Sequence, residues 1–273
     1  MVHRSVPAGR WFEPPEIDPD ATLRLFLFPH AGSGVTIYRE WGDLLPPSIA
    51  YQCVQLPGRQ QRHAETAYTD MPELLDALFE VVTAELDDRP YAFFGHCMGA
   101  QLAYRLAAMI ERDGRPGPVL VGASGWAPEG FLTPTLEQSQ MSEPEMKEWI
   151  IALGSLPAEV YDDPQLLALV LPALRADLAV CATAKDDGAK VSCAVASYGG
   201  RSDPLMLPDA MRSWPDRTST YLGNSEFPGG HFYIEEHALS VTSDLARHLQ
   251  RLAEEPAVGG PAAEEPTAAA VRP

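Results

Sequence analysis

The sequence predicts an α/β protein with a mainly parallel sheet flanked by helices. Short apolar runs typical of buried strands alternate along the chain with longer segments of helical periodicity. Several of these runs end in loops rich in glycine and small polar residues. With 273 residues and 45% hydrophobic content, the chain can bury one large core, so we expect a single domain over residues 21–252.

The composition limits the classes of partner and site. A net charge of -18 disfavours nucleic acid and anionic membranes, because both are polyanions. The chain has no long apolar run and no signal-like N-terminal stretch, so we expect a soluble cytoplasmic protein. The four cysteines are widely spaced, and the histidines and carboxylates lack metal-ligand spacing. We therefore expect neither disulfides nor a metal site.

The first part of the chain supplies two predicted strands and a helix. Residues 1–20 are rich in proline and charge without a clear period, which predicts an arm outside the folded domain. Strands are predicted over residues 23–28 and 51–56, and an amphipathic helix follows over residues 71–86. The small residues at 29–34 follow the first strand, where backbone amides can face a ligand.

The next predicted strand, residues 91–94, runs into the sequence Gly-His-Cys-Met-Gly, and a helical pattern continues to Gly114. This Gly-x-Cys-x-Gly pattern is typical of a nucleophile elbow, a strained turn in which glycines let strand and helix approach closely. Cys97 would then project at the top of the sheet, beside the Met98 amide at a helix N-terminus. The alternative is a buried structural cysteine, since free cysteine is among the most buried residue types.

The second part of the chain continues the alternation and interrupts it once. Strands are predicted over residues 119–124 and 191–198, and an amphipathic helix over residues 234–252. Between those strands, residues 128–185 contain only proline-interrupted helical pieces, which predicts a helical lid over the sheet edge. Ordinary crossover helices are the alternative. The Ala/Pro/Glu-rich residues 253–273 are predicted to be disordered.

Three predicted loops at the C-terminal ends of strands carry Cys97, Asp203 and His231 in that order. Nucleophile, acid and histidine follow one another in this order in α/β-hydrolases, which predicts that fold. His231 would take the thiol proton and later activate the acyl acceptor, while Asp203 holds the imidazole. The Met98 amide and, as a second candidate, the Ala31 amide would hold the oxyanion. This chemistry requires no diffusible cofactor.

The acidic member of this set has alternatives. Asp203 belongs to an Asp-Pro dipeptide and in the alternative reading only shapes a turn. Asp209 and Asp216 are then the candidate carboxylates.

Six ordered sequence blocks carry a resemblance to a known family. They lie at residues 28–32, 56–59, 95–100, 171–177, 199–204 and 227–232. Together they resemble the type II thioesterases that accompany polyketide synthases and nonribosomal peptide synthetases, over about residues 20–252. The resemblance implies removal of acyl groups from the phosphopantetheine arm of acyl- or peptidyl-carrier proteins, under a mobile helical lid.

Two features depart from the family pattern. Cys97 stands where the family carries serine, and residues 124–128 are one residue shorter than the usual Ser-Gly-x-x-Ala-Pro. Attack of a thiol on a thioester gives another thioester, so the acyl group stays activated for transfer. Three hypotheses follow: a cysteine thioesterase, an acyltransferase or cyclase, and a low-turnover carrier-protein binder in which Cys97 arose by drift or engineering. Intact-mass spectrometry with an acylated carrier protein distinguishes them.

The predicted partner suggests where it docks. Carrier proteins are usually acidic, so a chain of charge -18 needs a locally basic surface to bind one. The candidate docking residues follow the second predicted strand and are Arg59, Arg62 and His63, while His30 is a candidate substrate contact. The alternative is that the two arginines lie in a plain solvated loop.

Overall fold

The computed structural model describes residues 10–154 and 162–254. Its centre is a seven-stranded sheet in the order β1-β3-β2-β4-β5-β6-β7. The strands are β1 (Phe12–Glu13), β2 (Leu23–Phe28), β3 (Ile49–Val54), β4 (Tyr91–His96), β5 (Leu120–Ser124), β6 (Val191–Gly200) and β7 (Thr218–Phe227). Among the strand pairs that the structure describes in this sheet, only β1–β3 is antiparallel, so the predicted mainly parallel sheet is confirmed.

The central strands are covered on both faces. Every residue of β2 and β4 is buried, which explains why both read as continuous apolar runs rather than alternating ones. The rings of Phe26 and Phe28 pack edge-to-face on Phe93 at centroid distances of 5.9 and 5.3 Å. This packing fixes the middle of the sheet, from which the elbow emerges.

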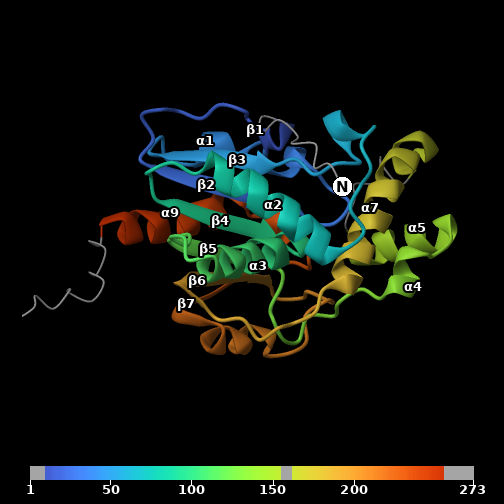
Figure 1. Cartoon of the computed structure of the whole chain (residues 1–273). Helices are drawn as coiled ribbons and strands as arrows, with labels where there is room; N and C mark the ends of the chain where they lie inside the picture. The colour runs from blue at the N-terminus through green and yellow to red at the C-terminus, as the bar shows by residue number, and fades with distance from the viewer. Residues whose placement is uncertain (1–9, 155–161, 255–273) are drawn as a thin grey trace, which may run out of the picture.

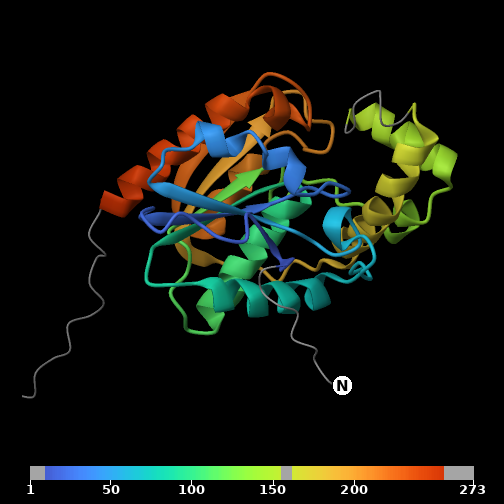
Figure 2. The same ribbon diagram turned by 90° about the horizontal axis from the view of Figure 1, so that it is seen from above.

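Helices form a layer on each side of the sheet (Figures 1 and 2). α2 (Met71–Glu85) and α3 (Met98–Arg112) pack on one face, and α1 (Trp41–Leu44) and α9 (Ala238–Glu254) pack on the other. α2 begins where the Asp70 carboxylate accepts a hydrogen bond from the Glu73 amide, with Pro72 in the first turn. The arrangement confirms the α/β-hydrolase fold class.

A helical segment joins β5 to β6 and lies beyond one end of the sheet (Figure 2). It contains α4 (Leu136–Ser139), α5 (Glu143–Leu153) and α7 (Pro164–Thr183). α5 and α7 share a small apolar core that includes Met146, Ile150, Leu167, Leu171, Leu174 and Leu178. α7 is long and apolar enough to cross a membrane, but 56% of that stretch is buried, as in the core helix of a soluble protein.

Four short helices complete the described chain. They are η2 (Val35–Tyr38), η3 (Gln60–Arg62), η4 (Ala210–Asp216) and α8 (Tyr233–Glu236). η2 and η3 follow β2 and β3, and α8 follows the loop after β7. Together these connections surround the C-terminal edge of the sheet.

Two features at the sheet edges differ from the sequence-based expectations. The prediction that residues 1–20 lie outside the domain is wrong for Phe12 and Glu13, which form β1 and pair with β3. The side chains of Trp11 and Phe12 are buried. Aromatic burial therefore ties this part of the N-terminal segment to the domain. The polar edge strand β7 lacks an apolar run and was not predicted. Residues 255–273, which belong to the tail predicted to be disordered, lie outside the described residues, and so do residues 1–9.

Candidate active site

Cys97 lies in a sharp turn between β4 and α3. Its backbone has φ 55° and ψ -118°, a strained conformation for a residue other than glycine. A Cβ on Gly95 would lie 2.1 Å from the Gly99 carbonyl oxygen, and one on Gly99 would lie 2.0 Å from the Phe28 carbonyl oxygen. Both glycines are therefore required by the close approach of strand and helix, and the turn has the geometry of a nucleophile elbow.

His231 and Asp203 come together from the loops after β7 and β6. The His231 Nδ1 atom lies 2.7 Å from Asp203 Oδ2, and both side chains are buried. The two loops are joined by backbone hydrogen bonds from Arg201 to Phe227 and from Ser202 to Gly229, of 2.9 and 3.0 Å. The sheet edge thus brings the acid and the histidine into direct contact.

The two roles considered for Asp203 are compatible. Its Oδ1 atom accepts a hydrogen bond from the Leu205 amide at 2.9 Å and shapes the turn, while Oδ2 binds His231. Asp209 is paired with Arg212 on the surface, and Asp216 is also exposed. Of the three candidate carboxylates, Asp203 is the one at the imidazole.

The surroundings of His231 stabilise the positive charge that its ring carries once it has taken a proton. Burial alone lowers the pKa of the imidazole, but the interactions of the ring with Cys97 and Asp203 outweigh burial and raise the pKa to about 10. The other ring nitrogen, Nε2, is buried and, apart from its interaction with Cys97, has no hydrogen-bond partner within residues 10–154 and 162–254. It is therefore available to exchange a proton with the neighbouring thiol.

Two backbone amides are available at the same edge of the sheet. Met98 is the first residue of α3, and Ala31 follows β2 and lines the same cavity as Cys97. Within the described part of the chain, neither amide donates a backbone or side-chain hydrogen bond. Unpaired amides beside a helix N-terminus are suited to stabilising a developing oxyanion.

Asp177 of α7 holds the loop that contains Ala31. Its Oδ2 atom accepts a hydrogen bond from the Gly32 amide at 2.7 Å, and its two oxygens bind the Arg59 guanidinium at 2.5 and 2.7 Å. Arg59 also donates to the Ser33 carbonyl oxygen at 3.0 Å. This buried pair connects α7 to the loop after β2, a link that the sequence did not reveal.

Arg59 and Arg62 do not form the expected docking surface. The Arg59 side chain is 6% exposed and forms an ion pair with Asp177, and the Arg62 side chain is 2% exposed. Arg62 donates to the Gln55 carbonyl oxygen at 2.7 Å, pairs with Glu65 and lies over the Trp11 ring. The prediction was wrong because the partners that bury these arginines are not recognisable from their own loop.

Two further histidines surround His231. The His30 ring is buried, its Nδ1 atom lies 3.0 Å from the Ala31 carbonyl oxygen, and burial lowers its pKa to about 4. The His96 ring lies 5.0 Å from that of His231 and bonds the Ser124 hydroxyl at 2.8 Å. Burial is also the main reason that the pKa of His96 is lowered. His231 is thus flanked by two neutral imidazoles, of which His96 was missed because it occupies a variable position of the motif.

A small apolar cavity of about 30 Å³ lies beside Cys97. α5 and α7 supply its aliphatic and aromatic wall with Trp149, Leu153, Leu174, Leu178 and Cys181. The cavity suits a short apolar group next to the thiol. Within the described ranges, no group of three or more His, Cys, Asp and Glu residues is arranged to hold a metal ion.

Comparison with known proteins assigns the family. The thioesterase domain model matches residues 23–252. The gramicidin S biosynthesis protein GrsT of Aneurinibacillus migulanus is 30% identical over 243 residues, which cover 89% of this chain and 94% of GrsT. The type II thioesterase BorB from the borrelidin biosynthetic cluster has a TM-score of 0.78 and 32% identity, covering 88% of this chain and 97% of BorB. RedJ, a thioesterase of the prodiginine pathway in Streptomyces coelicolor, has a TM-score of 0.77 and 30% identity, with coverages of 84% and 91%. The chain therefore belongs to the thioesterase family.

Proposed function

We propose that this protein is a type II thioesterase that hydrolyses acyl groups bound as phosphopantetheine thioesters to acyl- or peptidyl-carrier proteins. Its partner would be a polyketide synthase or nonribosomal peptide synthetase, as the resemblance to type II thioesterases implies. GrsT, BorB and RedJ are themselves named as proteins of gramicidin S, borrelidin and prodiginine biosynthesis. The observation that carries the proposal is the buried His231–Asp203 pair beside Cys97 in its strained turn. A cytoplasmic location remains a prediction from the sequence.

In the first half of the proposed reaction, His231 Nε2 takes the proton of the Cys97 thiol. The thiolate sulfur attacks the thioester carbonyl carbon, and the Met98 and Ala31 amides donate hydrogen bonds to the resulting oxyanion. The carbon–sulfur bond to the arm then breaks, and the imidazolium returns the proton to the departing sulfur. Asp203 keeps the imidazole in the required tautomer and stabilises its charge throughout.

In the second half, His231 takes a proton from water, and the oxygen attacks the carbonyl carbon of acyl-Cys97. The bond to the Cys97 sulfur breaks, the sulfur regains the proton from His231, and the carboxylic acid departs. The neutral His30 and His96 rings add no positive charge that would oppose protonation of His231.

The cysteine favours a second candidate function. Thioester exchange with Cys97 forms and breaks the same kind of bond, so the acyl-enzyme remains as activated as the substrate. An amine, a thiol or an internal nucleophile can then replace water in the second half. This chemistry supports an acyltransferase or cyclase as the alternative, with the same residues in the same roles.

A product assay with acylated carrier protein tests the proposal. Incubation with the unmodified protein should release free carboxylic acid and the carrier with its free thiol, both identified by mass spectrometry. Cys97→Ala should release neither. Equal release by this variant would contradict the proposed mechanism, and products that appear only with an added amine or thiol would favour acyl transfer over hydrolysis.

A further inference from the structure

The loop that carries His231 has little rigidity of its own. It joins Phe227 to Tyr233 and contains two adjacent glycines, Gly229 with φ 106° and Gly230. Because glycine allows many backbone conformations, contacts of neighbouring side chains must hold His231 in place. The buried Tyr233 ring stacks on the Phe227 ring at a centroid distance of 5.4 Å and an interplanar angle of 7°. Tyr233 therefore anchors the far end of this loop.

A chain of hydrogen bonds runs from Tyr233 to the strand that precedes the elbow. The Tyr233 Oη atom lies 2.6 Å from Ser124 Oγ, and Ser124 Oγ lies 2.8 Å from His96 Nδ1. All three side chains are buried. The chain therefore joins the first residue of α8 to the last residues of β5 and β4.

Members of this chain also contact the two residues that exchange a proton in the proposed reaction. The Ser124 carbonyl oxygen accepts a hydrogen bond from the Cys97 amide at 2.8 Å. The His96 ring lies 5.0 Å from the His231 ring. In the described part of the chain, its buried Nε2 atom has no hydrogen-bond partner apart from an interaction with the His231 backbone. The thiol and the imidazole are thus tied to one network.

The direction of the hydrogen bonds follows from the donors available. Among the described residues the Tyr233 hydroxyl has one partner, so its proton goes to Ser124 Oγ, because a buried O–H group without an acceptor is costly. Ser124 then donates its own proton to His96 Nδ1. His96 therefore carries its proton on Nε2. Burial lowers the pKa of this ring, and the charges of the facing His231 and His30 rings lower it further, so His96 stays neutral.

We propose that this chain of three side chains positions His231 for proton exchange with Cys97, an inference that rests on the proposed function. The three residues act through His231 and not on the substrate. They hold the glycine-containing loop at Tyr233 and beside the His231 ring. The imidazole and the thiol then keep the alignment that proton transfer requires.

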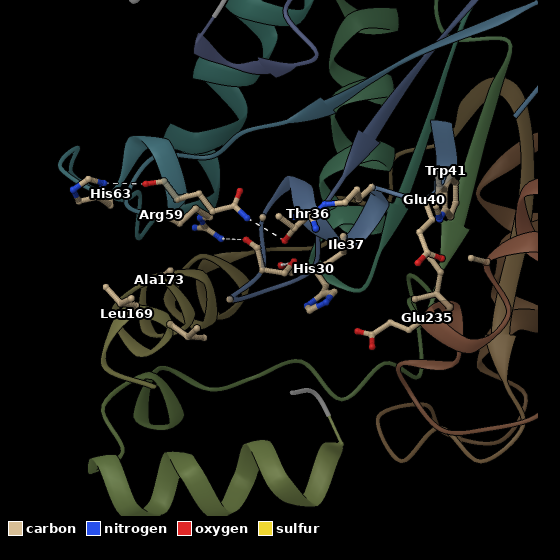
Figure 3. Close-up of a pocket in the computed structure, with 18 residues that line it drawn as sticks. His30, Thr36, Ile37, Glu40, Trp41, Arg59, His63, Leu169, Ala173 and Glu235 are labelled. Atoms are coloured by element: carbon tan, nitrogen blue, oxygen red, sulfur yellow. Dashed lines mark hydrogen bonds between the residues drawn. The ribbon is translucent and has the colours of Figure 1, made fainter. Parts of the chain in front are cut away.

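The chain lines neither of the spaces described beside the site. A groove of about 810 Å³ lies between the η2 and η3 segments on one side and α7 and α8 on the other. His30 lines it, and the Glu235 side chain of α8 turns toward its middle (Figure 3). The small apolar cavity is bordered by Cys97 and His231. Since the chain contributes to neither lining, changes in it should alter kcat with little effect on KM.

An isosteric substitution with a matched control tests the positioning role. Tyr233→Phe keeps the ring that stacks on Phe227 but removes the hydroxyl that begins the chain. Tyr91→Phe is the control, since this buried tyrosine donates to the Pro116 carbonyl oxygen at 2.7 Å from the end of β4 opposite the elbow. Tyr233→Phe should lower kcat about tenfold and leave KM within about twofold. Tyr91→Phe should change neither, and an equal loss of kcat in both variants would overturn the proposal.

The tautomer of His96 gives a readout on the unmodified protein. Nitrogen NMR of histidine-labelled protein should show the His96 proton on Nε2, with Nδ1 as the acceptor and no titration around neutral pH. A proton on Nδ1 would overturn the hydrogen-bond chain on which the proposal rests.

The reactivity of the thiol separates this inference from the proposed function. In alkylation by iodoacetamide the Cys97 sulfur displaces iodide after His231 takes the thiol proton, and no thioester is needed. Peptide mapping should show that Tyr233→Phe slows this reaction about fivefold at neutral pH, whereas Tyr91→Phe does not. If the unmodified protein hydrolyses no thioester but this difference persists, the proposed function fails and the positioning role stands. An alkylation rate that Tyr233→Phe leaves unchanged would overturn the positioning role.

Discussion

The edge of the sheet and the helical segment beside it are held in different ways. Backbone contacts fix the positions of Cys97, Asp203 and His231, through the tight elbow and the hydrogen-bonded loops after β6 and β7. Side chains hold the helical segment, through a small apolar core and the link from Asp177 to Arg59. The comparison indicates that the apolar side chains of α5 and α7 that line the cavity can change while the proposed catalytic geometry is kept, whereas Asp177 cannot.

The largest expected effect comes from removing the Cys97 thiol. Cys97→Ala should lower thioester hydrolysis about a thousandfold or more, because no other group at the elbow can form the acyl-enzyme. Cys193→Ala is the control, since this buried thiol lies in β6 away from the site and should leave kcat unchanged. If the two variants hydrolyse the thioester at the same rate, the sheet edge is not the catalytic region.

Replacing the acid, Asp203, is expected to lower kcat less than the loss of the Cys97 thiol, but still by a large factor. Asp203→Asn should lower kcat about a hundredfold or more, because the imidazole loses the partner that fixes its tautomer and stabilises its charge. It should also lower the pKa of His231, because the variant removes a negative charge and a hydrogen bond that raise it. NMR titration of the imidazole measures this shift.

Asp209→Asn is the matched control for the acid, since Asp209 is exposed and paired with Arg212. It should change neither kcat nor the titration of His231. A His231 pKa that stays the same in Asp203→Asn would contradict the described geometry.

The Asp177–Arg59 pair tests how the two regions are joined. Asp177→Ala leaves the buried Arg59 charge without its partner, so the free energy of unfolding should fall by about 3–5 kcal/mol. The loop with the Ala31 amide also loses its anchor, and kcat should fall about tenfold in the folded protein. Denaturant unfolding and steady-state kinetics measure the two effects.

Asp113→Ala breaks an exposed ion pair with Arg115 and serves as the control for the Asp177 variant. It should change the free energy of unfolding by less than about 1 kcal/mol. A loss of stability in Asp177→Ala with an unchanged kcat would mean that α7 stabilises the fold without positioning the amide.

The smallest effect on the chemistry is expected in the cavity wall. Trp149→Ala enlarges the space beside Cys97, so the ratio of kcat/KM for longer over shorter acyl groups should rise about tenfold. Glu148→Ala changes the preceding, exposed residue of α5 and should leave this ratio unchanged. A series of acyl thioesters of increasing length gives the ratio, and an unchanged preference would place the acyl group elsewhere.

The sequence predicted the features that follow from the order of strands and from the glycines of tight turns. Each residue of the proposed triad follows a strand, and parallel strands bring such residues to one edge of the sheet. The Cys97 elbow was recognisable because its glycines are required by close contacts with the backbone. The contact between Asp203 and His231 follows from the same topology.

Features that depend on distant side chains were not readable in the same way. Arg59 looked like a free surface charge because its partner Asp177 is 118 positions away in the sequence. The polar sequence of β7 does not predict a strand, because this segment is held in the sheet by its pairing with β6 rather than by an apolar face of its own. The groove next to His30 combines four separate segments, so no single stretch of the sequence could predict it.

Mass spectrometry of the acyl-enzyme tests the role of Cys97 in one experiment. The protein would be mixed with a slight excess of acylated carrier protein, quenched in acid within one turnover and digested for peptide mapping. We predict a transient mass increase equal to the acyl group on the peptide that contains Cys97, decaying as free acid appears. Turnover without any adduct, or an adduct confined to Cys53, Cys181 or Cys193, would contradict it.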